Sequence, residues 1–446
     1  MPNTQIVIHR GQRITVAGLG RFGGGIEVCR WLASQGAKVL VTDREPAERL
    51  GESVQKLAGL PLEFRLGEHR VEDFTSADVI VTSPALPPRN EFLEAARRAG
   101  VPVTTEVRLF IERCPCPILG VTGTKGKSTT SAMLGEILRR RHTTWVGGNI
   151  GGSLLGELDR MSSSDRVVLE LSSYMLEHLR GMSWSPHVAI VTMISPDHLE
   201  WHGSYESYVD AKKNILRFQK PTDAAVLSDS DPTTPDFARQ TPGRVSYFGS
   251  QGAPFEIGLI GAHNQANAQA AWVAASTQDV SRDDAQVALA GFKALPHRLQ
   301  VVAELGGVKW IDDSIATIPQ AAVAACGAFP DGTVIQIVGG YDKHLDMGSM
   351  HDQLSRRCKA ILTIGALGPA IAGAVRNNPR ATADVHECDE LARAVEKARA
   401  LAAPGDVILL SPGCASYDQF VNFEARGDAF TALARQASIQ RIAPSP

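Results

Sequence analysis

The 446-residue sequence lacks any apolar run that approaches the ~20 residues needed to span a membrane. The stretch from Met1 to Gly11 also lacks the apolar segment of a secretory signal peptide. The sequence also has no large excess of charge of one sign, because 45 basic and 48 acidic residues give a formal net charge of -3. Nucleic-acid binding requires a clear basic surplus. We therefore expect a cytoplasmic protein with no membrane segment and no nucleic-acid partner.

Cysteine is scarce, and its pattern excludes a zinc site. The seven cysteines are an odd number, and the one close pair, Cys114 and Cys116, has no second Cys or His pair at zinc spacing. We interpret them as free thiols. The sequence also contains no repeat of fixed period and no low-complexity segment. Its length predicts three domains of ~150 residues each.

The segment from Pro117 to Leu134 predicts a nucleotide-binding loop. An apolar run over 118–121 indicates a buried parallel strand, and a helix is expected to begin near Ser128. The turn between them consists of Gly123, Thr124, Lys125 and Gly126. Small residues there leave backbone N–H groups to face a phosphate, and the helix directs the positive end of its dipole at the same anion. Lys127 adds a positive charge, and the Ser128 hydroxyl can bind Mg²⁺.

The first part of the chain predicts a Rossmann unit. A strand from Arg13, a glycine turn over 18–23, a helical segment and a second strand that ends at Asp43 follow one another. An acidic residue ~20 positions after such a turn suits a ribose hydroxyl. The fingerprint alone indicates NAD, but a dehydrogenase leaves the phosphate loop unexplained, and any diphosphate ligand can use the turn. A later strand ends in the prolyl loop 84–88, either a ligand-side loop or a plain turn.

Polar side chains end two strands predicted in the central region. Glu170 ends the apolar strand 166–170, and His198 follows another strand at 187–192. A carboxylate in that position is costly unless it is paired or binds a metal. The neighbouring phosphate loop favours Mg²⁺, with a structural salt bridge as the alternative. A histidine at a strand end of the same sheet can reach the same ion.

Two predicted helices of the central region carry further candidates. Lys212 and Lys213 lie in a helix over 204–218, where a lysine pair is ordinarily part of a solvent-exposed face. Asn264 and Asn267 lie three positions apart near the start of another helix. Their amides therefore share one face and can contact the edge of an adenine.

These patterns predict an α/β protein of three domains. Residues 1–107 form an N-terminal Rossmann-like parallel sheet, and residues 108–296 form a central P-loop-type mononucleotide-binding sheet with a glycine-rich turn at 145–152. Residues 297–446 contain apolar strands that end in small or polar residues. This region predicts a C-terminal doubly wound Rossmann-like sheet with a ligand edge of its own.

Short motifs follow one another through nearly the whole chain. In order they are Thr122-Gly-Thr-Lys-Gly-Lys-Ser-Thr129, Glu170-Leu-Ser-Ser173, Asp197-His198, Ala211-Lys212, His263-Asn264-x-x-Asn267, Pro296-His297-Arg298, Asp313-Ser314 and Ser411-Pro412-x-Cys-Ala-Ser416. This set resembles the Mur ligase family. The segment from Ser411 to Gly427 is most similar to the members that add glutamate as the second amino acid of the peptidoglycan stem peptide.

The resemblance implies an ATP-dependent ligase that acts as a monomer. ATP would convert the terminal carboxylate of UDP-N-acetylmuramoyl-L-alanine into an acyl phosphate, and the amine of D-glutamate would attack it to form an amide. This step belongs to peptidoglycan synthesis and so to cell-wall biogenesis, cell shape and cell division. The implied catalytic residues are Lys127, Lys212 and His198. Lys212 resembles a carbamylated lysine that helps to bind the second of two Mg²⁺ ions.

The resemblance also assigns the binding residues. Those for ATP are Gly123, Thr124, Lys125, Gly126, Lys127, Ser128, Thr129, Asn264, Asn267, Arg298 and Asp313. Those for the metal are Ser128, Glu170, His198 and Lys212. Those for the UDP substrate are Gly18, Gly20, Arg21, Phe22, Asp43, Asn149 and Ser172. Those for glutamate are Thr317, Lys343, Ser416, Tyr417 and Phe423.

Some positions depart from the family pattern and leave alternatives open. Ile315 stands where the D-glutamate enzymes often have lysine, so a variant that adds L-glutamate is an alternative. Lys125, Met175 and Ala85 also replace the usual residues. A ligase similar to folylpolyglutamate synthase shares the phosphate loop, but it leaves the N-terminal unit unexplained. A catalytically silent nucleotide-binding module would not need intact Lys127, Glu170, His198 and Lys212.

Overall fold

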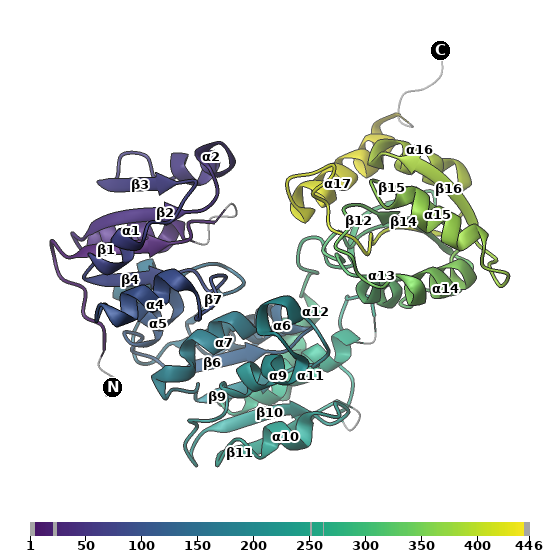
Figure 1. Ribbon diagram of the computed structural model, residues 1–446. Coiled ribbons are helices and arrows are strands. Elements are labelled where there is room, and N and C mark those ends of the chain that lie inside the picture. The colour runs from purple at the N-terminus through teal and green to yellow at the C-terminus, as the bar shows by residue number, and fades with distance from the viewer. Residues whose placement is uncertain (1–4, 21–24, 250–251, 262, 441–446) are drawn as a thin grey trace. The chain divides into compact units, whose positions relative to one another are not determined.

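The computed structural model describes residues 5–20, 25–249, 252–261 and 263–440. The chain divides into two compact units, of which the first comprises the described residues of Met1–Ile257 and Gln265–Gly291. The second unit comprises those of Gly258–Asn264 and Phe292–Pro446. Three sheets with flanking helices lie in these units (Figure 1), so the predicted α/β class with three domains is confirmed.

The N-terminal sheet is parallel and has the strand order β3-β2-β1-β4-β5. Its strands are β1 (Arg13–Ala17), β2 (Lys38–Asp43), β3 (Leu62–Leu66), β4 (Val79–Thr82) and β5 (Val103–Thr104). Its helices are α1 (Ile26–Ser34), α2 (Ala47–Gln55), α3 (Val71–Thr75), α4 (Glu91–Arg98) and α5 (Glu106–Ile111). The strand order changes direction between β1 and β4, and ligands of such sheets bind at the carboxyl ends of the strands beside that point.

The central sheet is also parallel, with the order β11-β10-β9-β6-β8-β7. Its strands are β6 (Ile118–Thr122), β7 (Thr144–Gly148), β8 (Arg166–Glu170), β9 (Val188–Val191), β10 (Ala224–Ser228) and β11 (Arg244–Phe248). The helices around it are α6 (Lys127–Leu138), η1 (Leu155–Arg160), α7 (Ser173–Leu179), η2 (Arg180–Met182), α8 (Leu199–His202), α9 (Tyr205–Lys213), α10 (Thr234–Ala238), α11 (His263–Ser276) and α12 (Arg282–Ala290).

The C-terminal sheet is mixed and has the order β12-β13-β17-β14-β15-β16, with only β12 antiparallel to its neighbour. Its strands are β12 (Gln300–Leu305), β13 (Val308–Asp312), β14 (Val334–Gly339), β15 (Ala360–Ile364), β16 (Asp384–Asp389) and β17 (Val407–Leu410). Its helices are α13 (Pro319–Cys326), α14 (Gly348–Arg357), α15 (Gly368–Arg376), α16 (Leu391–Leu401) and α17 (Phe423–Gln440).

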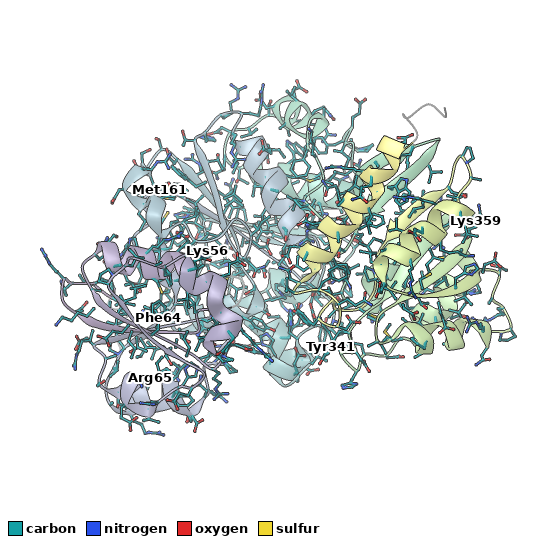
Figure 2. The ribbon with its side chains drawn as sticks, turned by 90° about the horizontal axis from the view of Figure 1, so that it is seen from above. Lys56, Phe64, Arg65, Met161, Tyr341 and Lys359 are labelled. Carbon is teal, nitrogen blue, oxygen red and sulfur yellow. The ribbon has the colours of Figure 1, made fainter. Side chains whose placement is uncertain are left out.

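Two details of these sheets differ from the sequence-based expectations. The glycine-rich turn predicted at 145–152 is wrong for its first half, because those residues continue edge strand β7 and pair with β8. Edge strands such as β3 were not predicted, because they contain no buried apolar run. In β3, Phe64 is 38% exposed, and its neighbour Arg65 (both labelled in Figure 2) is partly exposed. Arg65 forms an ion pair with Asp73 at 2.6 Å.

The N-terminal and central sheets share one apolar core. Ile14 and Val41 of the first sheet, Val107 of α5 and Leu169 of the central sheet belong to the same buried cluster. The boundary predicted at residue 107 therefore falls inside a helix that is part of this core. No helix in the described part of the chain is both long enough and apolar enough to cross a bilayer.

Candidate functional site

The phosphate loop lies between β6 and α6 and is held by a neighbouring segment, 192–195. The Thr192 hydroxyl donates to the carbonyl oxygen of Lys125 at 2.6 Å, and the Thr124 amide donates to that of Met193 at 2.7 Å. The Thr124 hydroxyl accepts from the amide of Ser195 at 2.9 Å and lies 2.7 Å from the Tyr208 hydroxyl. These bonds come from the end of β9 and from α9, so the protein itself fixes the shape of the loop.

Two glycines of the loop have conformations and surroundings that exclude a side chain. Gly123 has φ +147°, and a Cβ there would lie 1.8 Å from Thr192 Oγ1. Gly126 has φ +86°, and its Cβ would lie 2.5 Å from Asn267 Oδ1. Both glycines therefore let the loop backbone approach its anchors closely.

We expect Gly123→Ala to destabilise the protein by about 1–3 kcal/mol, because the added methyl group overlaps the anchor of the loop. The measurement is the midpoint of urea unfolding. Gly156→Ala is the matched control, since a Cβ at Gly156 meets nothing within 4 Å. Equal midpoints for the two variants would contradict the tight fit described above.

Side chains from the loop and from α6 gather at the helix N-terminus. Lys127 Nζ donates to the carbonyl oxygen of Thr124 at 3.0 Å, and Lys125 is exposed. Ser128 and Thr129 lie in the first helical turn and are each 9% exposed. A cation, two hydroxyls and the helix N-terminus at one place form an arrangement that can bind phosphate.

Glu170 at the end of β8 is fully buried, and within the part of the chain that the structure describes only one of its carboxylate oxygens accepts a hydrogen bond. Oε1 accepts from Asn149 Nδ2 at 2.9 Å. Within the described residues, Oε2 is buried without a hydrogen-bond partner. Such an oxygen is costly to bury unless a cation or a proton donor reaches it. Asn149, which we expected to contact the UDP substrate, thus holds the predicted metal ligand.

The described ranges contain no group of three or more His, Cys, Asp or Glu side chains arranged to hold a metal. This is compatible with Mg²⁺, which is usually bound by one or two carboxylates together with water and substrate phosphates. The buried Oε2 of Glu170 therefore fits an ion whose other ligands are hydroxyl, phosphate and water oxygens.

His198 lies at the start of α8 in a left-handed conformation, with φ 52°. Its ring lies 4.9 Å from that of Tyr174, and Asp197 and Glu200 lie at 3.6 and 3.8 Å from its nitrogens. Partial burial lowers the pKa of His198 below its ordinary value, and the charges of Lys127 and Lys212 act in the same direction. The charges of two predicted site lysines therefore act on His198.

The lysine pair on α9 is divided between two environments. Lys212 is 1% exposed, and its Nζ donates to the carbonyl oxygen of Gly123 at 2.7 Å and lies 4.7 Å from the Tyr208 ring centre. None of the ion pairs of the described residues involves Lys212. Burial, and then the charge of Lys127, lower the pKa of Lys212 well below its ordinary value. Lys213 instead lies 3.9 Å from Asp236, so the solvent-exposed face inferred from residue type alone is wrong for Lys212.

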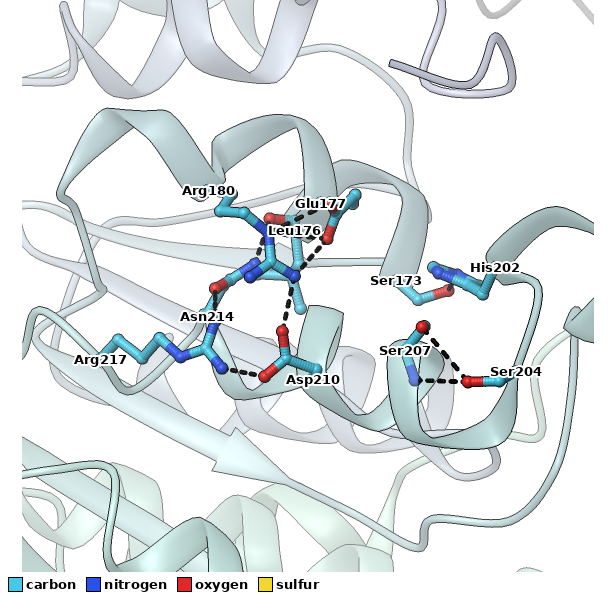
Figure 3. Close-up of polar contacts among 10 residues, drawn as sticks. All are labelled: Ser173, Leu176, Glu177, Arg180, His202, Ser204, Ser207, Asp210, Asn214 and Arg217. Atoms are coloured by element: carbon cyan, nitrogen blue, oxygen red, sulfur yellow. Dashed lines mark hydrogen bonds and ion pairs between the residues drawn. The ribbon is translucent and has the colours of Figure 1, made fainter. Parts of the chain in front are cut away.

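A set of polar contacts fixes α9 against α7 (Figure 3). Arg180 contacts Glu177 at 2.7 Å and Asp210 at 2.8 Å, and Asp210 also pairs with Arg217. Asn214 Nδ2 donates to the carbonyl oxygen of Leu176 at 3.0 Å. These contacts link α9 to α7, while the buried side of α9 carries Lys212 toward the phosphate loop.

The two asparagines predicted to contact adenine form hydrogen bonds with different parts of the structure. Asn267 Oδ1 accepts from the Thr130 hydroxyl of α6 at 3.3 Å, and Asn264 Nδ2 donates to the carbonyl oxygen of Ile260 at 2.8 Å. Asn267 therefore supports the helix of the phosphate loop. Its contact with adenine remains a prediction.

Arg298 and Asp313 belong to the second unit. Asp313 accepts from the amide of Leu299 at 3.2 Å and from the hydroxyl of Ser411 at 2.7 Å. Burial raises the pKa of Asp313 to about 7, an effect that the charge of Arg298 partly opposes. Sequence reasoning did not predict the buried pair beside them, in which His297 Nδ1 donates to Asp312 Oδ2 at 2.7 Å. In the sequence, only the Pro-His-Arg and Asp-Asp runs indicated this pair of His297 with Asp312.

Of the residues predicted to bind the UDP substrate, Arg21 and Phe22 lie outside the described residues. Asp43 accepts from the amides of Gly20 at 3.0 Å and Glu45 at 2.9 Å, so its carboxylate shapes the glycine turn. A Cβ on Gly18 would lie 2.8 Å from Ser83 Cβ. The Ser172 hydroxyl caps α7 by accepting from the Met175 amide at 3.2 Å.

The second unit contains a small open pocket at the carboxyl end of β14. It is lined by Thr317, Tyr341, Asp342, Lys343, Leu345, Met347, Leu367, Gly413 and Cys414. Two predicted glutamate residues, Thr317 and Lys343, thus face one space. The exposed Tyr341 (labelled in Figure 2) meets Tyr417 edge-on at 6.0 Å, and Ser416, next to Tyr417, is buried. Phe423 does not line the pocket, because its ring packs against His297 at 6.1 Å.

Comparison with protein families matches three regions of the chain. Residues 12–105 match the "Mur ligase MurD-like, N-terminal domain", residues 121–253 the "Mur ligase middle domain", and residues 297–414 the "Mur ligase, glutamate ligase domain". The three regions together cover most of the chain.

Curated relatives match over almost their whole length. The UDP-N-acetylmuramoylalanine–D-glutamate ligase of Roseiflexus sp. (strain RS-1) is 40% identical, over 94% of this chain and 97% of the relative. The protein of the same name from Symbiobacterium thermophilum is 37% identical, over 96% of this chain and 98% of the relative. The solved UDP-N-acetylmuramate-alanine ligase MurC of Thermotoga maritima has a TM-score of 0.62 at 19% identity, covering 96% of this chain and 100% of that chain. The last likeness concerns the fold alone.

Proposed function

The chain belongs to the Mur ligase family, and from this premise we propose that it is an ATP-dependent ligase that adds D-glutamate to UDP-N-acetylmuramoyl-L-alanine in peptidoglycan synthesis. The observation that carries this proposal is the 40% identity, over 94% of the chain, to a D-glutamate ligase. The match of residues 12–105 to a MurD-like N-terminal domain favours a UDP-linked substrate over a folate. We further propose that the protein is cytoplasmic, where its seven free thiols would stay reduced, and that it acts as a monomer, as the family resemblance implies.

The reaction begins with a carboxylate that attacks the γ-phosphate of ATP, so two anions must meet. Positioning and charge stabilisation carry most of such a transfer, and no nucleophilic side chain is needed. Lys127, the amides of the loop and the N-terminus of α6 would bind the phosphates and stabilise the charge that develops on them. The loop has its anchors in the protein, so these donors are already oriented before ATP binds.

Glu170 and Ser128 would hold one Mg²⁺, and His198 with modified Lys212 would hold the other. The ions, when bound, neutralise phosphate charge during the transfer. Oε2 of Glu170, which has no hydrogen-bond partner among the described residues, supports the first site. Asn149 would orient the carboxylate by holding Oε1.

We propose that Lys212 reacts with CO₂ to form a carbamate. The ammonium first loses one proton. The neutral amine then attacks the carbon of CO₂, and a second proton leaves the nitrogen, so that a cation becomes an anion with the release of two protons. Lys212 is buried and forms no ion pair with a carboxylate of the described residues. Among these residues its ammonium would therefore contact no counter-charge, only neutral groups such as the Gly123 carbonyl oxygen and the Tyr208 ring. A carbamate N–H would still donate to the carbonyl oxygen of Gly123.

In the second unit, glutamate would bind in the pocket that contains Thr317 and Lys343. Glutamate brings two carboxylates, and an unpaired one is costly to desolvate. Lys343 would pair with one of them. Ser416 and Tyr417, beside the pocket, would contribute further contacts, while the position of Phe423 against His297 gives it a supporting role.

We expect Lys343→Ala to raise the KM for glutamate about tenfold or more, since a charged hydrogen bond contributes roughly 1.5–3 kcal/mol. The KM for ATP should change far less. The measurement is steady-state ADP release with each substrate varied in turn. Lys359→Ala is the matched control, because Lys359 pairs with Asp406 away from the pocket. A similar rise in both KM values for Lys343→Ala would remove the assignment.

The decisive test of the proposed function is incubation with ATP, Mg²⁺ and UDP-N-acetylmuramoyl-L-alanine, with each amino acid offered in turn. Phosphate release together with a mass gain of one glutamyl residue is the expected result. Ile315, in place of the lysine often found in the D-glutamate enzymes, keeps L-glutamate as the second candidate. Turnover with L-glutamate but not with D-glutamate would reverse the stereochemical assignment.

A further inference from the structure

The prolyl loop 84–88 follows β4 at the carboxyl edge of the N-terminal sheet and packs on Gly18. Leu86 Cδ1 lies 3.2 Å, and Ser83 Cβ 2.8 Å, from the position that a Cβ on Gly18 would occupy. This is the edge at which ligands of such sheets bind. The placement of the loop therefore determines the shape of the predicted site for the uridine diphosphate.

Two side chains of the central domain hold this loop. Trp201 Nε1 of α8 donates to the carbonyl oxygen of Ala85 at 2.9 Å, and His178 Nε2 of α7 donates to that of Leu86 at 2.9 Å. A carbonyl oxygen only accepts, so His178 carries a proton on Nε2. The loop is rich in proline, which has no N–H to offer. Side chains from outside the loop therefore supply an important part of its fixation.

The same two side chains belong to a cluster of rings that reaches the catalytic end of the site. The Trp201 ring lies 4.6 Å from that of Tyr174 and 6.5 Å from that of His178. Tyr174 in turn lies 4.9 Å from His198. Rigid rings with fixed contacts thus connect the proposed metal ligand His198 with the loop of the N-terminal domain.

We infer that Trp201 and His178 are a pair of positioning residues, which we call the clasp. They hold the prolyl loop in a fixed position relative to His198 and so place the UDP end of the substrate relative to the reacting carboxylate. This inference rests on the proposed function. Without the clasp, the prolyl loop spends less time in the conformation that binds the UDP substrate. The apparent affinity for that substrate falls in proportion to the fraction of time that the loop spends in this conformation. ATP would bind at the phosphate loop, which is anchored by other residues. We therefore expect the KM for ATP to stay unchanged when the clasp is removed.

The test compares Trp201→Phe and His178→Leu with two controls. His178→Gln keeps an N–H donor at the position of Nε2. Trp145→Phe removes a similar indole bond, the one from Trp145 Nε1 to Asp165 Oδ2 at 2.8 Å, away from the prolyl loop. We measure KM for UDP-N-acetylmuramoyl-L-alanine, KM for ATP, the thermal midpoint, and the Kd of UDP by calorimetry.

We expect Trp201→Phe and His178→Leu to raise the KM of the UDP substrate about 3- to 10-fold each, the range for one lost hydrogen bond, with the KM of ATP unchanged. Both controls should keep the wild-type KM, although Trp145→Phe lowers the thermal midpoint as Trp201→Phe does. Equal rises in both KM values, or a wild-type KM in Trp201→Phe, would overturn the clasp. If His178→Leu fails to fold, Trp201→Phe decides.

Failure of the proposed function gives a different result. An inactive wild-type protein would contradict the ligase, while the Kd of UDP would still decide on the clasp. In that case a weaker Kd in Trp201→Phe than in Trp145→Phe supports the clasp, and equal values overturn it.

Discussion

Lys127→Ala is expected to leave a folded protein that has lost about 100- to 1000-fold of its ligation rate, the effect of removing one preorganised donor to a developing charge. Lys127 begins α6, and its Nζ donates to the carbonyl oxygen of Thr124 in the loop. The side chain is only partly buried, so its removal opens no core cavity. At 1.36 kcal/mol per tenfold change, the loss equals about 3–4 kcal/mol of transition-state stabilisation.

The rate is measured as ADP release with all three substrates at saturation, and the fold is checked by the unfolding midpoint. Lys220→Ala serves as the control, because Lys220 is an exposed lysine of the same unit. A variant at Lys127 that keeps more than about a tenth of the wild-type rate would argue against the phosphate role of this lysine.

Lys212→Ala is expected to abolish ligation, with a loss of at least about 100-fold, while Lys213→Ala stays active. Adjacent helical positions point ~100° apart, so only one of the two side chains can face the loop. That side chain is Lys212, 2.7 Å from the Gly123 carbonyl oxygen, whereas Lys213 points to Asp236.

Formate or acetate should partly restore the activity of Lys212→Ala, because a small carboxylate can occupy the volume of the missing carbamate. A second measurement does not depend on activity. With ¹³C-bicarbonate, a carbamate carbon resonance is expected in the wild type and in Lys213→Ala but not in Lys212→Ala. A resonance that survives in Lys212→Ala, or an inactive Lys213→Ala, would move the modification elsewhere.

Features encoded in contiguous residues were predictable. The phosphate loop is one, because its strand, glycines, lysine and helix N-terminus adjoin one another, and the same backbone that forms the turn also forms the binding groups. Buried parallel strands such as β6, β8 and β9 were also predictable, because a short continuous apolar run is typical of a strand that is buried on both faces of a parallel sheet. The half-exposed edge strands β3 and β12 lack that signal.

By itself the sequence determined the α/β class, the three domains, the phosphate loop and, by resemblance, the family. Only the tertiary structure decided which groups contact one another. Asn149 donates a hydrogen bond to Glu170, and Lys212 donates one to the carbonyl oxygen of Gly123. Phe423 packs against His297 rather than in the pocket, and Trp201 donates to the prolyl loop. The reason is physical. Local pattern specifies which face of an element is apolar, whereas the partner of a polar side chain depends on the packing of elements that are distant in the chain, as in the ion pair of Arg180 with Asp210.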